Sequence, residues 1–190
     1  MRPAAVAPLA VLAALLAACG TDSSSDTSGT ETAAAYDAER VAPPADQRRP
    51  YSETEPERLT TEVELDGGGV MALWIDPDGF RKVWAQHSDP DDPDAWTEPV
   101  LLFEAGDGCL EVEADAAGGT VAATLDCYET DAFVQQAPDE SQAAVTTDLD
   151  TWDVEFFLEL YTEPVVSADG SSVDWKDSSV AWTADGGFTD

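Results

Sequence analysis

The sequence predicts an all-β domain built from repeated four-stranded antiparallel sheets, preceded by a segment without regular structure. Three observations lead to this prediction. The chain repeats its own landmarks with a period of about fifty residues. Short alternating segments are separated by Gly- and Pro-rich turns, and no segment shows a sustained helical period of apolar residues. The polar stretch that follows the apolar leader contains almost no large apolar side chains.

The repeat places Gly68-Gly69, Gly118-Gly119 and residues 167–171 at the same phase. A repeat of roughly twenty to fifty residues with turn signals is typical of propellers and stacked arrays. The alternative is an all-β chain whose Gly-rich hairpins match one another loosely. We therefore expect residues 59–190 to form two four-stranded antiparallel propeller-like blades plus a partial third.

Each complete unit is expected to contain four strands joined by turns and loops. In the first unit, residues 76–79 (Asp-Pro-Asp-Gly) predict a β-turn, because Pro and Gly occupy positions that turn geometry favours. An acidic loop over residues 87–95 then ends at Trp96, and the second unit contains a long loop through Pro138. The expected strands are residues 70–75, 80–86, 97–103 and 110–114 in the first unit, and residues 120–126, 141–146, 152–160 and 164–167 in the second.

The N-terminus has the pattern of an export leader. Arg2 precedes an apolar run that reaches Leu16-Ala17-Ala18-Cys19, which gives a positive start, a short apolar region and a small-residue cleavage site. The run is shorter than the roughly twenty residues that a membrane-spanning helix needs. The Leu-Ala-Ala-Cys ending resembles the lipobox of bacterial lipoproteins. That resemblance implies removal of residues 1–18, acylation of Cys19 and an extracytoplasmic chain anchored to the membrane through Cys19, and the alternative is ordinary secretion.

Residues 19–58 are interpreted as a disordered tether, because their Ser, Thr, Asp, Glu, Ala and Pro bury too little apolar surface to offset the entropy of ordering. The whole sequence contains 40 Asp and Glu against 8 Lys and Arg, a formal net charge of −32. Such a field repels nucleic acid and anionic ligands and favours association with cations. We therefore expect no nucleic-acid partner.

Cys109 and Cys127 are predicted to form a disulfide, because an even pair of cysteines in an exported chain is usually bonded. They lie equally far on either side of Gly118, in a predicted hairpin with a three-residue turn at Ala117-Gly118-Gly119. Opposed Cα atoms in such a hairpin are about 4.5–5.5 Å apart, which is within bridging range. We expect this hairpin to join two neighbouring blades.

Three segments carry a pattern of hydroxyl, acidic and aromatic residues near the ends of predicted strands. The pattern resembles the Asp-box (BNR) repeats of sialidase-like β-propellers, Ser/Thr-x-Asp-x-Gly-x-Thr-Trp, although no segment matches it completely. The resemblance implies a structural role, in which the Asp and the hydroxyls close the turn and the Trp packs between sheets. The matching residues are Ser88, Asp89 and Trp96 in the first segment, Thr146, Asp148 and Trp152 in the second, and Thr183, Asp185, Gly187 and Thr189 in the third.

The predicted domain offers no assembled catalytic set. Arg81 is its only arginine, so the three-arginine cluster with which sialidases bind a carboxylate is not present in one chain. His87, the only histidine, has no Ser-His-Asp spacing near it and is interpreted as a turn residue at a strand end. Carboxylates are so abundant that no single pair indicates a glycosidase. We identify no catalytic residue and expect no cofactor.

Four carboxylates gather in one short loop. Ca²⁺ takes six to eight oxygen ligands, and the loop supplies carboxylates but also two prolines and no glycine. A solvated loop is therefore favoured over weak surface Ca²⁺ binding. The candidate ligands are Asp89, Asp91, Asp92 and Asp94.

Two functions of different class fit these observations. The favoured one is a membrane-anchored extracytoplasmic binding or interaction module with a glycan or protein ligand, and the alternative is a glycoside-hydrolase-like enzyme. The six tryptophans are interpreted as core residues, with sugar stacking as the alternative. Because closed propellers have about four to eight blades, we expect either an open array or an oligomer that completes a ring.

Overall fold

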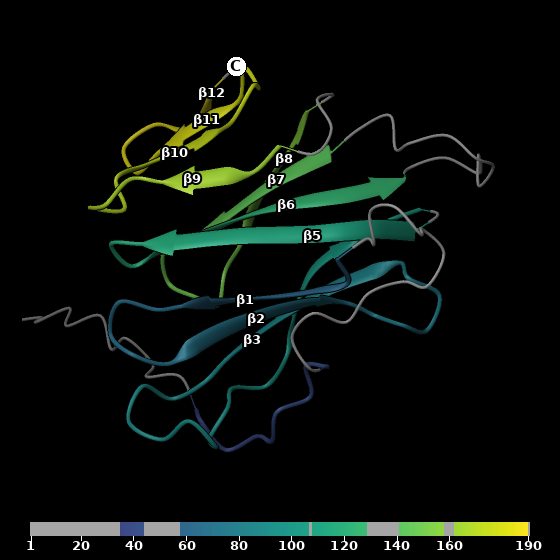
Figure 1. Ribbon diagram of the computed structural model, residues 1–190, viewed down its shortest axis with the longest axis vertical. Helices are drawn as coiled ribbons and strands as arrows, with labels where there is room; N and C mark the ends of the chain where they lie inside the picture. The colour runs from purple at the N-terminus through teal and green to yellow at the C-terminus, as the bar shows by residue number, and fades with distance from the viewer. Residues whose placement is uncertain (1–34, 44–57, 107, 129–140, 158–161, 190) are drawn as a thin grey trace, which may run out of the picture. The chain divides into compact units, whose positions relative to one another are not determined.

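The computed structural model describes residues 35–43, 58–106, 108–128, 141–157 and 162–189 (Figure 1). Within these ranges the chain forms twelve β-strands and no helix. The described part of the chain accordingly contains no helical segment with the length and apolarity to cross a membrane. The all-β prediction is confirmed.

The strands form three four-stranded antiparallel sheets, each a meander in which consecutive strands are neighbours. The first sheet contains β1 (Thr60–Glu64), β2 (Val70–Ile75), β3 (Lys82–His87) and β4 (Val100–Glu104). The second sheet contains β5 (Gly108–Ala117), β6 (Thr120–Tyr128), β7 (Ser141–Thr146) and β8 (Asp153–Phe157). The third sheet contains β9 (Pro164–Val166), β10 (Ser172–Trp175), β11 (Ala181–Thr183) and β12 (Gly187–Thr189).

Each sheet begins one strand earlier than the sequence indicated. β1 opens the first sheet, β5 opens the second instead of closing the first, and the expected fragment of a third unit has four strands of its own. β1 was missed as a strand because its residues are mostly polar and partly exposed. The third sheet was underestimated because three of its strands are only three residues long, shorter than the five or six residues typical of a strand.

The first strands of the three sheets, β1, β5 and β9, are neighbours, as in consecutive propeller blades (Figure 1). Successive side chains of a strand point to opposite faces, so the middle sheet can pack on both sides. Val121, Ala123 and Leu125 of β6 lie in the core shared with the first sheet. Ala122 lies in a second core, with Trp175 and other residues of the third sheet.

The remaining face of the first sheet is covered by residues 35–43. Ala38 forms a β-bridge with Trp96, and the buried amide of Gln86 accepts a hydrogen bond from the backbone N–H of Val41 (2.9 Å) and donates to the carbonyl of Glu39 (2.9 Å). Ala42 joins Trp96 in an apolar cluster on this face. Residues 35–43 were expected to belong to the tether, but these contacts make them part of the folded domain.

The predicted disulfide between Cys109 and Cys127 is confirmed. It joins β5 to β6 within the second sheet, so it does not connect two blades as expected. The hairpin turn contains two residues, Gly118 and Gly119, both with positive φ (59° and 80°), as a two-residue type I′ turn requires. A bulge that skips Leu110 then shifts the register by one residue and brings the two cysteines opposite each other.

Candidate ligand-binding pocket

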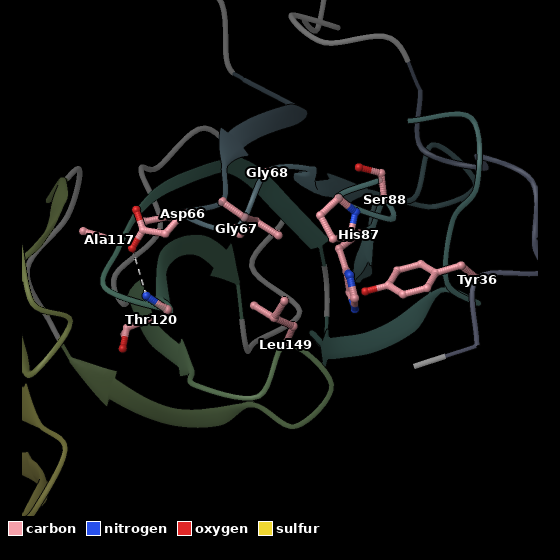
Figure 2. Close-up of a pocket in the computed structure, with 13 residues that line it drawn as sticks. Tyr36, Asp66, Gly67, Gly68, His87, Ser88, Ala117, Thr120 and Leu149 are labelled. Carbon is pink, nitrogen blue, oxygen red and sulfur yellow. Dashed lines mark hydrogen bonds between the residues drawn. The ribbon is translucent and has the colours of Figure 1, made fainter. Parts of the chain in front are cut away.

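A pocket of about 170 Å³ lies where the turns and loops of the first two sheets meet (Figure 2). Its walls come from the β1–β2 turn, the β5–β6 turn, the loops that follow β3 and β7, and residues 35–43. The lining is mainly apolar. The lining residues are Tyr36, Leu65, Asp66, Gly67, Gly68, His87, Ser88, Pro90, Ala116, Ala117, Gly119, Thr120 and Leu149.

The β1–β2 turn is held in place by the loop after β3. The hydroxyl of Ser88 accepts a hydrogen bond from the N–H of Val70 (2.9 Å). A Cβ on Gly69 would lie 2.9 Å from the carbonyl oxygen of Ser88, so only glycine allows this approach. Asp66 then reaches the neighbouring sheet, where its carboxylate accepts a hydrogen bond from the N–H of Gly119 (3.2 Å; Figure 2).

The loop between β7 and β8 brings Leu149 to the wall of the pocket and Asp150 close to His87. The carboxylate of Asp148 accepts hydrogen bonds from the N–H groups of Asp150 (3.0 Å) and Thr151 (2.7 Å) and from the hydroxyl of Thr146 (3.1 Å). Burial alone would raise the pKa of Asp148, but these hydrogen bonds outweigh it and lower that pKa. Leu149 has φ of 67°, a left-handed conformation that is costly for a leucine and requires such support.

His87 is the polar group at the inner wall of the pocket. It is the last residue of β3, pairs with Met71 across the sheet and is only 3% exposed. Among the described residues, neither ring nitrogen has a partner with hydrogen-bond geometry, although the backbone of Ser88 lies near enough to the ring to raise its pKa. The nearest carboxylate oxygen, on Asp150, is 3.9 Å from Nε2. The expected turn residue is therefore a buried strand residue whose side chain lines the pocket.

Tyr36 closes the pocket beside His87. The two rings meet edge to face, with their centroids 5.4 Å apart. Figure 2 shows the Tyr36 hydroxyl directed toward the imidazole. Burial lowers the pKa of His87, and the Asp150 charge and the backbone of Ser88 only partly oppose that shift. Burial and the charges of Asp89 and Asp150 raise the pKa of Tyr36. Around neutral pH both rings are therefore uncharged, and the nearby charges are negative.

The three segments that resemble Asp boxes each lie between the third and fourth strands of a sheet. Only the second shows the expected aspartate-closed turn with a bonded hydroxyl, through Asp148 and Thr146. In the other two segments the hydroxyl groups form hydrogen bonds with the backbone instead. The hydroxyl of Ser88 accepts from the N–H of Val70. The hydroxyl of Thr183 accepts from the N–H of Gly186 (3.2 Å), and that of Thr189 donates to the carbonyl of Ala181 (3.4 Å). Asp185 is exposed, and Gly187 has φ of 70°.

The two tryptophans of these segments pack in different places: Trp96 lies on the outer face of the first sheet, and Trp152 lies against the core between two sheets. Trp96 is buried and donates from its indole N–H to the carbonyl of Pro93 (3.1 Å). Trp152 packs against the core between the first and second sheets. A wider hollow of about 530 Å³ on the outer face of the first sheet is lined by Trp74 and Trp84 together with Val41, Pro43, Asp76, Pro77 and Pro99.

The four acidic residues proposed for Ca²⁺ are not gathered around one point. Asp89 accepts a hydrogen bond from the N–H of Asp91 (2.8 Å), and Asp92 accepts from the N–H of Asp94 (3.1 Å). These carboxylates therefore shape their own loop. Among the residues that the structure describes, no three His, Cys, Asp or Glu side chains are close enough to hold one metal ion.

Sequence reasoning did not identify Tyr36 and Leu149, which line the pocket, or Asp150, which lies beside His87. Tyr36 was assigned to the tether, and Leu149 and Asp150 were treated only as turn residues. The sequence offered one signal for this site, because His87 is the only histidine in the chain. Cys19, the predicted lipidation site, lies outside the described residues. Comparisons of this chain with protein-family models, with curated proteins and with solved structures found no match.

Proposed function

We propose that this chain is a lipid-anchored extracytoplasmic binding module whose ligand enters the pocket between the first two sheets. The export leader and the Leu-Ala-Ala-Cys19 ending support the location. The pocket supports the activity, because it is concave, mostly apolar and contains a few polar groups, as ligand sites usually are.

The observation that carries the proposal is the unpaired imidazole of His87. Most buried side-chain polar atoms have a hydrogen-bond partner, and an unsatisfied one costs roughly 1–3 kcal/mol. Both nitrogens of His87 are buried without a partner of hydrogen-bond geometry among the described residues, and His87 lines the pocket (Figure 2). A ligand that bonds to His87 would recover this free energy on binding.

The pocket offers less support for glycoside hydrolysis. That chemistry generally uses two carboxyl groups on either side of the scissile bond. Among the residues that line the pocket, Asp66 is the only carboxylate, and it already accepts a hydrogen bond from Gly119. The geometry therefore favours binding.

The location is tested by changing Cys19 to Ser. We expect the wild-type chain in the membrane fraction, with a mature N-terminus whose mass includes acyl chains, and the Cys19→Ser variant released from the membrane. Unacylated wild-type protein in the medium would contradict the proposed anchor.

Binding is tested with the full chain purified in detergent. Glycans, cell-wall fragments, amines and organic acids are screened by calorimetry, alongside chromogenic glycosides for turnover. We expect saturable binding without turnover, weakened at least about tenfold by Tyr36→Ala, which removes one wall of the pocket. Val165→Ala is the matched control, because Val165 is exposed on the third sheet and does not line the pocket. Silence toward every compound, or turnover that one carboxylate substitution abolishes, would contradict the proposal.

A further inference from the structure

We propose that the pocket binds a small primary ammonium compound through His87 and Asp150. This inference rests on the proposed function and names the class of ligand. It joins four observations: an unpaired buried imidazole, a carboxylate beside it, a mainly apolar wall and a small volume.

The imidazole defines the hydrogen-bonding partner. A neutral histidine has one N–H donor and one nitrogen lone pair, and neither nitrogen of His87 has a partner of hydrogen-bond geometry among the described residues. An ammonium group carries three N–H donors. One of them can be donated to the free lone pair of His87 and another to the carboxylate of Asp150, whose Oδ1 lies 3.9 Å from Nε2.

The charges around the pocket select a cation. Asp66 lines the pocket, Asp150 lies beside His87, and the charge of Asp89 reaches Tyr36. No Lys or Arg is among the lining residues. An anionic ligand would meet only negative charge here, whereas an ammonium is attracted to the carboxylates and to the electron-rich face of an aromatic ring.

The remaining walls and the volume define the rest of the ligand. Leu65, Ala116 and Leu149 are apolar and belong to the edge of the core, so they suit a short hydrocarbon stem. The volume of about 170 Å³ is below the roughly 300–1,000 Å³ of pockets for drug-sized ligands. A stem of a few carbon atoms therefore fits better than an extended chain.

The test uses three probes that share one stem and differ in charge: n-butylammonium, n-butanol and butyrate. His87 is the only histidine, so its Cε1–H proton gives a single NMR signal at the site, provided that the full chain carries no histidine tag. We expect n-butylammonium to shift this signal saturably, n-butanol to bind at least about tenfold more weakly, and butyrate to have no effect at moderate salt.

Two variants with the same change of net charge separate a specific site from the general acidity of the chain. Asp150→Asn removes the carboxylate beside His87 and is expected to weaken n-butylammonium about tenfold. Asp94 lies in the loop after β3, does not line the pocket and is not among the charges that act on His87 or Tyr36, so Asp94→Asn is expected to leave the affinity unchanged.

Equal binding of n-butanol, tighter binding of butyrate, or equal losses in the two variants would overturn the inference. If none of the three probes shifts the His87 signal, the inference is also overturned. In that case the proposed function stands when the wider screen finds another compound that Tyr36→Ala weakens, and falls when the screen is silent.

Discussion

Gly118 and Gly170 meet where the hairpin turns of the second and third sheets touch. A Cβ on Gly118 would lie well inside 3.0 Å of the backbone of Asp169, and a Cβ on Gly170 would collide in the same way with the carbonyl oxygen of Gly118. The hydroxyl of Thr120 also donates to the carbonyl of Gly170 (2.8 Å). Two backbones can approach this closely only because neither residue has a side chain.

Gly118→Ala should therefore be much more costly than Gly119→Ala. Both residues have positive φ, which costs about 1–2 kcal/mol for a residue with a Cβ, but a Cβ on Gly119 would meet nothing within 4 Å. We expect Gly119→Ala to lower the free energy of unfolding by about 1–2 kcal/mol and Gly118→Ala by at least about 3 kcal/mol. Urea unfolding measures both, and equal losses would show that the turns are not in contact.

His87 predicts a pH dependence of stability. Its pKa is lowered in the folded state by burial, so the unfolded chain binds a proton at a higher pH than the folded chain does. Stability is therefore expected to fall as the pH decreases below the ordinary histidine pKa of about 6.5. The titratable groups that face the ring are Tyr36 and Asp150.

The comparison variant is His87→Gln, which does not titrate. Unfolding free energies of the wild type and of the variant should diverge between pH 7 and pH 5, with the wild type losing more. Parallel curves would mean that His87 has the same pKa in both states. Glu111, whose pKa burial raises, acts in the opposite direction but equally in both proteins.

At the scale of the element, the loop between β7 and β8 depends on one carboxylate. Asp148→Ala removes the acceptor of two backbone N–H groups and one hydroxyl, and we expect it to lower the free energy of unfolding by about 1 kcal/mol. Asp185→Ala is the matched control, since Asp185 has the equivalent place in the third segment but is exposed and accepts no hydrogen bond among the described residues. A loss of similar size in both variants would contradict the assigned role of Asp148.

Local patterns predicted the strands and turns well. The expected strands at residues 70–75 and 141–146 have the bounds of β2 and β7, because continuous apolar or small residues marked them. The disulfide was predicted correctly, but from a hairpin register that differs from the observed one. The expected three-residue turn has two residues, and the bulge at Leu110 compensates for the difference. A bulge leaves no sequence signal that alternation can detect.

The division into sheets and the pocket were harder to predict, because both depend on contacts between distant segments. Whether the strand at residues 108–117 ends one sheet or begins the next is decided by its pairing with β6. Tyr36 belongs to the pocket because residues 35–43 dock on the first sheet through the amide of Gln86. Periodicity along the chain contains no information on such docking.

For the whole molecule, both ends of the array are closed to a further blade. The outer face of the first sheet is partly covered by residues 35–43 and Trp96, beside the hollow lined by Trp74 and Trp84. On the third sheet, Val173 and Trp175 face the second sheet, whereas Asp174 and Thr183 are exposed. A polar outer face on a terminal unit caps a repeat array, so we expect a monomer and not the ring-completing oligomer that the blade count suggested.

Deleting residues 36–43 should therefore change the oligomeric state. The deletion would expose Ala72, Trp74 and Trp96 on the face of the first sheet, and a contiguous apolar patch favours association. Light scattering is expected to give a monomer mass for the wild type and a larger mass for the deletion. An equally long deletion between residues 20 and 33 serves as the control, and a wild-type mass equal to two or more mature chains would contradict the expectation.

The covering of the middle sheet on both faces has a consequence for how the backbone opens to solvent. Every residue of β7 is buried, and β6 lies between β5 and β7 with the disulfide at one end and the Gly118 turn at the other. Amide protons exchange with solvent deuterium at rates set by local opening, and the best-packed strands open only when the whole domain unfolds. The amides of β6 and β7 should accordingly exchange last, and those of the short strands β11 and β12 at the polar end of the array should exchange first.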